Sequence, residues 1–148
     1  MLTEDSLMMV FNDGEFQLTY PDGSKSLFEP IELHVRSPSE HTIEGKQHDV
    51  ELQIIHQYKG TQGQLGAGIA IMFDRKDGGE YDNPFLKSLQ LDKAVPDPGY
   101  PLTNVMVQEF LWNIDMSKYW TYQGSLTTPP CSEGITWTVI EQIQPLSL

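Results

Sequence analysis

Short apolar or alternating runs of residues, separated by turn-forming residues, recur along most of this chain. The runs occupy residues 7–11, 15–20, 31–36, 50–56, 67–73 and 135–143. Turn chemistry lies between them, for example at Pro21-Asp22-Gly23 and Glu44-Gly45-Lys46. Such a pattern is typical of β-strands joined by tight turns. The sequence therefore predicts a mainly β domain with a largely antiparallel sheet, in which residues 31–36 and 50–56 form adjacent central strands.

One short helix is predicted at residues 83–91. Asn83 can cap this helix and Pro84 suits its first turn, and apolar residues then recur on one side at positions 85, 86 and 89. The Pro-rich residues 95–101 are expected to form a surface loop. A single helix of this length leaves the fold class mainly β.

Composition limits the domain count and the partners. The 148 residues, 39% of them hydrophobic, suffice for one buried core, so residues 1–148 are predicted to form a single domain. The formal net charge of -12 repels phosphate backbones and anionic lipid head groups, which argues against nucleic acid and membrane surfaces as partners. No apolar run reaches the roughly 20 residues that cross a bilayer, and no targeting signal is recognised. The sequence does not indicate the cellular compartment.

The four histidines of the chain lie close together in the sequence, which suggests a metal site. They are His34, His41, His48 and His56. Side chains alternate along a strand, so His34 should share a face with Glu32 and Arg36, and Gln53 should share one with Glu51. A catalytic zinc site needs three protein ligands, and each face offers at most one good one. From the residues alone, a hydrogen-bonded structural role is favoured over metal binding.

Residues 119–133 have an unusual composition, with several aromatic residues followed by two threonines and two prolines. Prolines stiffen the backbone, so such a loop can hold a hydroxyl group in a fixed orientation. The alternative, favoured from the residues alone, is a tight turn beside an aromatic cluster.

This stretch, together with Trp137, resembles the signature of the α-carbonic anhydrases, Tyr-Trp-x-Tyr-x-Gly-Ser-Leu-Thr-Thr-Pro-Pro-Cys-x-Glu. Residues 38–45 and 49–52 resemble the second block of that family, Pro-Ser-Glu-His-Thr-x-x-Gly and the Glu-Leu-His strand. The resemblance spans essentially the whole chain and implies a twisted, largely antiparallel central sheet with few short helices. A complete family domain begins earlier and ends later, so residues 1–148 are expected to be a partial domain that lacks the N- and C-terminal parts.

The resemblance also assigns the zinc-ligand positions. In the family, a His-x-His strand supplies two zinc ligands and the Glu-Leu-His strand supplies the third. The matching positions here are His34, Arg36 and Gln53, so only the first is still a histidine. A guanidinium has donors only, and a neutral amide oxygen is a poor zinc ligand. Since zinc generates the nucleophilic hydroxide in this chemistry, the sequence predicts that zinc, the family cofactor, is lost.

Other positions of the family site are better retained. Thr127 and Glu40 match the substrate-orienting threonine and its carboxylate, and this pair is expected to be vestigial. Glu51 matches the carboxylate behind the third ligand, and Glu32 stands where a glutamine usually supports the first. Buried carboxylates need a countercharge, so Arg36 is predicted to form an ion pair with Glu51 or, failing that, with Glu32.

The favoured function is a catalytically degenerate domain that serves as a structural or protein-interaction module in a larger chain or assembly. One alternative is an active zinc enzyme that hydrates carbon dioxide to bicarbonate, with Glu32 or Glu51 joining His34 as ligands. Another is a small-anion pocket at Arg36 and Thr127. Other protein chains or the missing flanking segments are the expected partners, because an incomplete sheet leaves unpaired edges.

Cys131 is the only cysteine, which excludes an internal disulfide and a cysteine-based zinc site. In many secreted relatives this position pairs with a cysteine near the start of the domain, and family members are often secreted or membrane-anchored. The thiol is therefore expected to be bonded outside these residues or, in a reducing compartment, to be a small buried side chain.

Overall fold

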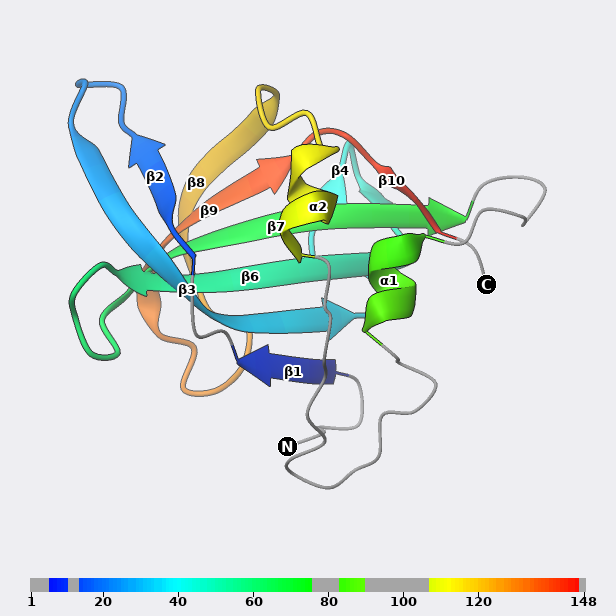
Figure 1. The fold of residues 1–148 in the computed structure, drawn as a ribbon, viewed down its shortest axis with the longest axis horizontal. Coiled ribbons are helices and arrows are strands. Elements are labelled where there is room, and N and C mark those ends of the chain that lie inside the picture. Colours follow the sequence, from blue (N-terminus) through cyan, green and yellow to red (C-terminus); the bar gives the residue numbers. More distant parts are fainter. Residues whose placement is uncertain (1–5, 11–13, 76–82, 90–106, 147–148) are drawn as a thin grey trace.

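A computed structural model describes residues 6–10, 14–75, 83–89 and 107–146, with no side-chain description for residues 6–10 and 108. Ten strands and two short helices follow one another in this part of the chain (Figure 1). They are β1 (Ser6–Val10), β2 (Phe16–Thr19), β3 (Lys25–Arg36), β4 (Thr42–Ile43), β5 (Lys46–Gln47), β6 (Val50–Tyr58), β7 (Leu65–Arg75), α1 (Pro84–Ser88), α2 (Val107–Trp112), β8 (Tyr119–Ser125), β9 (Glu133–Ile140) and β10 (Gln144–Leu146). The predicted mainly β class is confirmed.

The main sheet has the strand order β1-β3-β6-β7-β9-β8, with β2 beside β3 and β10 beside β7. Most neighbouring strands are antiparallel, whereas β7 runs parallel to both β9 and β10. β3 and β6 lie next to each other at the centre, as predicted. Gly23 and Gly45 have φ angles of 82° and 77°, which explains why glycine stands in the two predicted turns.

Three elements differ from the sequence prediction or lie partly outside it. Residues 119–125 form strand β8, although this stretch was interpreted as a loop or tight turn. Helix α2 was not predicted. The predicted helix begins at Pro84, and the Asn83 side chain accepts hydrogen bonds from the backbone of Phe85 and Leu86. Its last residues, 90 and 91, and the predicted loop at 95–101 lie outside the described residues.

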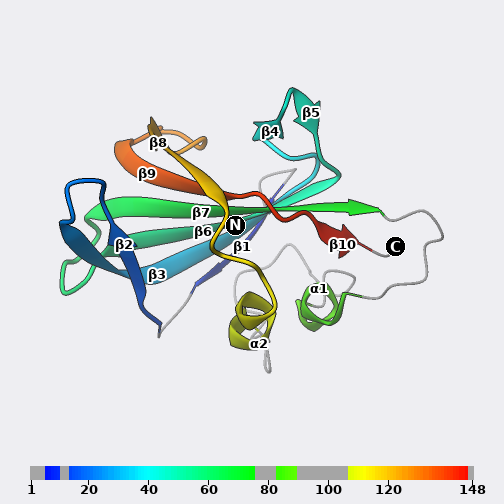
Figure 2. The same cartoon turned by 90° about the horizontal axis from the view of Figure 1, so that it is seen from above.

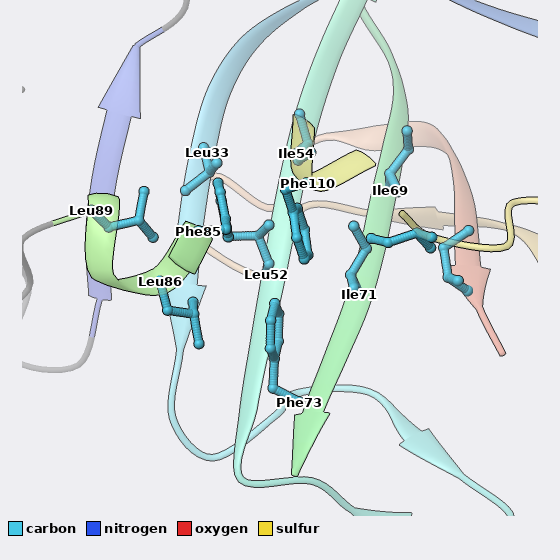
Figure 3. Close-up of a cluster of buried hydrophobic side chains, with 12 residues drawn as sticks. Leu33, Leu52, Ile54, Ile69, Ile71, Phe73, Phe85, Leu86, Leu89 and Phe110 are labelled. Atoms are coloured by element: carbon cyan, nitrogen blue, oxygen red, sulfur yellow. The ribbon is translucent and has the colours of Figure 1, made fainter. Parts of the chain in front are cut away.

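Figure 2 shows the sheet nearly edge-on, with both helices on one side and the β4–β5 hairpin on the other. The helix side holds the larger core, in which Phe85 and Phe110 stack with ring centroids 4.2 Å apart over the strands (Figure 3). Alternation along β6 sends Leu52 and Ile54 into this core and their neighbours to the opposite face. None of the described helices is long and apolar enough to span a membrane.

The opposite face of the sheet carries a second core cluster, and its buried members are Ile55, Ala70, Met72, Ile135, Trp137 and Val139. The Trp137 ring lies directly over Gly68, where a Cβ atom would come within 2.7 Å of it. This contact explains the glycine in the middle of β7. The candidate site lies on the same face of the sheet, beside this cluster.

Candidate functional site

The antiparallel register of β3 and β6 brings together the positions that the resemblance matches to the family's zinc ligands. His34 lies opposite Gln53, and Arg36 lies opposite Glu51. Residues directly opposite each other share one face of a sheet. The structure therefore places these four side chains on one face of the sheet, as the alternation along each strand predicted.

The Gln53 side chain joins two carboxylates. Its Nε2 donates to Glu40 Oε2 at 2.9 Å and to Glu51 Oε1 at 2.8 Å, and the residue is buried. An amide group has two N–H hydrogens, so both are used by these bonds. At the position of the third histidine of the family there is thus a hydrogen-bond donor that fixes two negative side chains.

Four donors converge on the Glu51 carboxylate, whose side chain has no solvent exposure. Besides Gln53, Oε1 is 2.6 Å from His41 Nδ1, and Oε2 accepts the backbone N–H groups of Glu40 and His41 at 2.8 and 2.9 Å. Burial acts to raise the pKa of Glu51, but the hydrogen bonds and the charge of His41 outweigh it and hold the pKa below its ordinary value. Glu51 therefore stays ionised inside the protein.

Thr127 and Glu40, the predicted orienting pair, are in contact. Thr127 Oγ1 donates to Glu40 Oε2 at 2.6 Å, although the two residues are 87 positions apart. The loop after β8 holds the threonine in place, because Leu126 N–H donates to Ser132 O and Cys131 N–H donates to Thr128 O, both at 2.9 Å. The loop interpretation of this part of the sequence thus fits residues 126–132.

Arg36 does not form the predicted ion pair with Glu51 or Glu32. Its Nε lies 3.5 Å from Oε1 of Glu40, which is four residues further along the chain, and this Nε makes no hydrogen bond with any described residue. The reason is that the Glu51 carboxylate already accepts four hydrogen bonds and has no room for a fifth. Glu32 is bound elsewhere, with its Oε2 3.1 Å from His34 Nε2.

His41 and Tyr122 belong to this network. The sequence analysis favoured a hydrogen-bonded structural role for the histidines without naming a partner, and it gave Tyr122 no role. The second ring nitrogen of His41, Nε2, lies 2.6 Å from the Tyr122 hydroxyl, and its ring meets Trp137 edge-on. Burial raises the pKa of Tyr122, with a further contribution from the Glu51 charge. The signal was available, since both residues lie within the two motifs that carry the family resemblance.

Cys131 is exposed and forms no disulfide within the described residues, and a bond to a group outside this chain stays a prediction. The expectation that Cys131 would be a small buried side chain is therefore wrong. The residue has a φ of 57° in the turn after the prolines, which places it at the surface of the loop.

The donor set at the positions matched to the family's zinc ligands does not fit zinc. It consists of one imidazole already bound to Glu32, one guanidinium, and one amide whose N–H groups are bound to carboxylates. Zinc sites use deprotonated or neutral lone-pair donors in a tetrahedral arrangement. Over the described part of the chain, no group of three or more His, Cys, Asp or Glu side chains is placed to hold a metal ion.

Comparison with known proteins identifies the class. The profile of eukaryotic-type carbonic anhydrases matches residues 21–148. The α-carbonic anhydrase of Photobacterium profundum superposes with a TM-score of 0.74 at 32% identity, covering 97% of this chain and 61% of that one. This chain therefore belongs to the α-carbonic anhydrase family.

Two further relatives show how much of the family domain is present. Alpha carbonic anhydrase 3 of Arabidopsis thaliana is 28% identical over 144 residues, which are 97% of this chain and 46% of the relative. A structure of dioscorin complexed with ascorbate superposes with a TM-score of 0.69 at 26% identity, covering 97% of this chain and 56% of that one. The chain spans about half the length of the curated relatives it matches.

Proposed function

We propose that this chain is a catalytically degenerate α-carbonic anhydrase domain that serves as a structural or protein-interaction module. The observation that carries the proposal is the double donation from Gln53 to Glu40 and Glu51. A side chain whose amide hydrogens are held by two carboxylates offers a cation only a neutral carbonyl oxygen, which is a poor zinc ligand.

The charge of Arg36 supports the proposal. Its side chain is 9% exposed, and its Nε lies 3.5 Å from Glu40. A guanidinium is a fixed positive charge, so Arg36 places a positive charge where the family has a histidine. A dication at this position would be repelled at short range in a region of low dielectric constant.

The two carboxylates that could act as substitute zinc ligands already have hydrogen-bond partners. Glu51 already accepts four hydrogen bonds, and Glu32 is bound to His34. Recruiting either carboxylate to a metal would break bonds to buried donors, which costs about 1–3 kcal/mol for each donor left unsatisfied. The contacts therefore argue against an active zinc enzyme built on these alternatives.

Elemental analysis of the purified protein, prepared with zinc in the medium, tests the proposal. We expect far less than one zinc per chain and no hydration of carbon dioxide above the uncatalysed rate. The double variant Arg36→His with Gln53→His should gain zinc, because it restores three imidazoles. The control Lys25→His with Gln123→His introduces two histidines away from the site and should not. Stoichiometric zinc in the unaltered protein would overturn the proposal.

A second candidate is the binding of a small anion at Arg36. It is favoured by the buried Nε, which makes no hydrogen bond with any described residue, and by the structure of dioscorin complexed with ascorbate. Calorimetric titration with bicarbonate and with ascorbate tests it. Binding that disappears in Arg36→Met would support an anion site, whereas no heat, or heat unchanged in the variant, would exclude one.

A further inference from the structure

Three side chains from distant segments form a row of short hydrogen bonds that the proposed function does not use. The Tyr122 hydroxyl on β8 lies 2.6 Å from His41 Nε2, and His41 Nδ1 lies 2.6 Å from Oε1 of Glu51 on β6. A phenol, an imidazole and a carboxylate thus follow one another. A hydroxyl beside a base, with the base oriented by a third group, is the arrangement in which proteins activate a nucleophile.

The charge of Glu51 decides where the hydrogens of this row lie. Because the Glu51 carboxyl stays ionised, it can only accept, and the hydrogen of its bond to His41 belongs to Nδ1. A neutral imidazole has a single N–H, so Nε2 carries a lone pair and accepts the hydroxyl of Tyr122. The imidazole therefore faces the phenol with the atom that can take up its proton.

Packing holds the two rings in this arrangement. The His41 ring meets the Trp137 ring edge-on, with centroids 5.0 Å apart, and the backbone N–H of His41 donates to Glu51 at 2.9 Å. The Tyr122 ring lies over Gly124, where a Cβ atom would come within 2.8 Å of Tyr122 Cε2. The glycine leaves space for the ring, so base and phenol are fixed before any reactant arrives.

Exposure differs along the row. Tyr122 is 45% exposed, whereas the His41 side chain is 14% exposed and that of Glu51 has no exposure. A reactant can thus approach the phenol from solvent, while the groups behind it are shielded. Tyr119 lies on the same strand, is 44% exposed, and its side chain makes no hydrogen bond with any described residue. It is a matched internal standard for Tyr122.

We propose that Tyr122 is a modification site, at which the phenol takes an acyl group from an activated ester with His41 as the general base and Glu51 as the group that orients the base. The phenolic oxygen bonds to the acyl carbon, and its proton passes to His41 Nε2. The bond between the acyl carbon and the leaving oxygen of the ester breaks, and the leaving group departs with the electron pair. The product is an ester of Tyr122. This inference goes beyond the proposed function and does not depend on the loss of zinc.

The environment of the phenol makes the test selective. Burial raises the pKa of Tyr122, with a further contribution from the Glu51 charge. A tyrosine that reacts only after spontaneous ionisation would therefore be acylated more slowly at this position than at Tyr119. Faster acylation of Tyr122 requires a base that removes the proton during the attack.

Timed acetylation of the full chain with p-nitrophenyl acetate at neutral pH, followed by peptide mass spectrometry, measures the rate at each tyrosine. Tyr122 should be acetylated about tenfold or more faster than Tyr119, since a positioned base contributes about 10²–10⁴-fold. His41→Gln should abolish this advantage and leave the Tyr119 rate unchanged. The control His56→Gln alters a histidine that contacts Phe16 instead of Tyr122, and it should retain the advantage.

Two results would overturn the inference. These are acetylation of Tyr122 no faster than that of Tyr119 in the unaltered chain, or an advantage of Tyr122 that persists in folded His41→Gln. The comparison of two tyrosines within one chain needs no variant, so it stays decisive if His41→Gln does not fold. A zinc-bound hydroxide would consume the ester for both tyrosines alike. Stoichiometric zinc would therefore overturn the proposed function without imitating a selective reaction at Tyr122.

Discussion

Replacement of Glu51 by glutamine tests whether the buried network holds this part of the fold together. The substitution changes the shape of the side chain very little, but it exchanges one carboxylate oxygen for an NH2 group. In the structure each oxygen accepts two hydrogen bonds, Oε1 from His41 and Gln53 and Oε2 from the backbone of Glu40 and His41. Either orientation of the glutamine therefore sets an NH2 group against two buried donors.

The expected cost follows from these contacts. Each buried donor left without an acceptor costs about 1–3 kcal/mol. Removing one partner from a buried charged pair, here Glu51 from His41, costs about 3–5 kcal/mol. Because the Glu51 side chain has no exposure to solvent, water cannot replace the lost acceptor. We therefore expect Glu51→Gln to reduce the free energy of unfolding by about 3–5 kcal/mol, the range measured for such pairs.

Urea unfolding followed by tryptophan fluorescence measures this change. Glu15→Gln is the matched control, because Glu15 is 49% exposed and pairs only at the surface with Lys59. The control should change stability by no more than about 0.5 kcal/mol. A Glu51→Gln variant as stable as the control would refute the reasoning, since it would mean that the four hydrogen bonds contribute nothing to folding.

Three further changes test other parts of the structure. Burial lowers the pKa of His56 from 6.5 to about 4, so the unfolded chain binds the proton more tightly and stability is lost as the pH falls below 6.5. Urea midpoints should reveal a loss of about 2 kcal/mol at pH 5 that is absent in His56→Gln, and an equal loss in both proteins would contradict this cause. Gly68→Ala should destabilise the fold by about 1–3 kcal/mol in the same assay, because its Cβ would collide with the Trp137 ring, and an unchanged midpoint would contradict the packing. Asn83→Ala should cost about 1 kcal/mol, measured by thermal unfolding, because the cap of α1 is lost, whereas Asn83→Asp should retain most of it.

The sequence by itself determined the strand framework and the composition of the site. Alternation and turn residues predicted β3 and β6 as adjacent central strands, since period-two patterning and glycine turns are local properties. The family motifs supplied the positions of His34, Arg36 and Gln53. Residue identity alone showed that two of these three positions are not histidine.

Local sequence patterning was not sufficient to predict strand β8. Residues 119–125 contain β-forming aromatic residues, but they lack a clean alternation of apolar and polar side chains. The segment becomes a strand because it pairs with β9 along its whole length. Pairing of this kind is a tertiary property, since cross-strand packing decides which segments with ambiguous patterns form strands.

Only the tertiary structure decided the partner of Arg36. The strand register places Arg36 opposite Glu51, but the chain that follows β3 also brings Glu40 close to the Arg36 side chain. His41, Gln53 and two backbone N–H groups take the Glu51 oxygens first, which leaves Glu40 for the guanidinium. The choice depends on several donors competing for one buried carboxylate, and the number of those donors is set by how residues 40 and 41 fold back against β6.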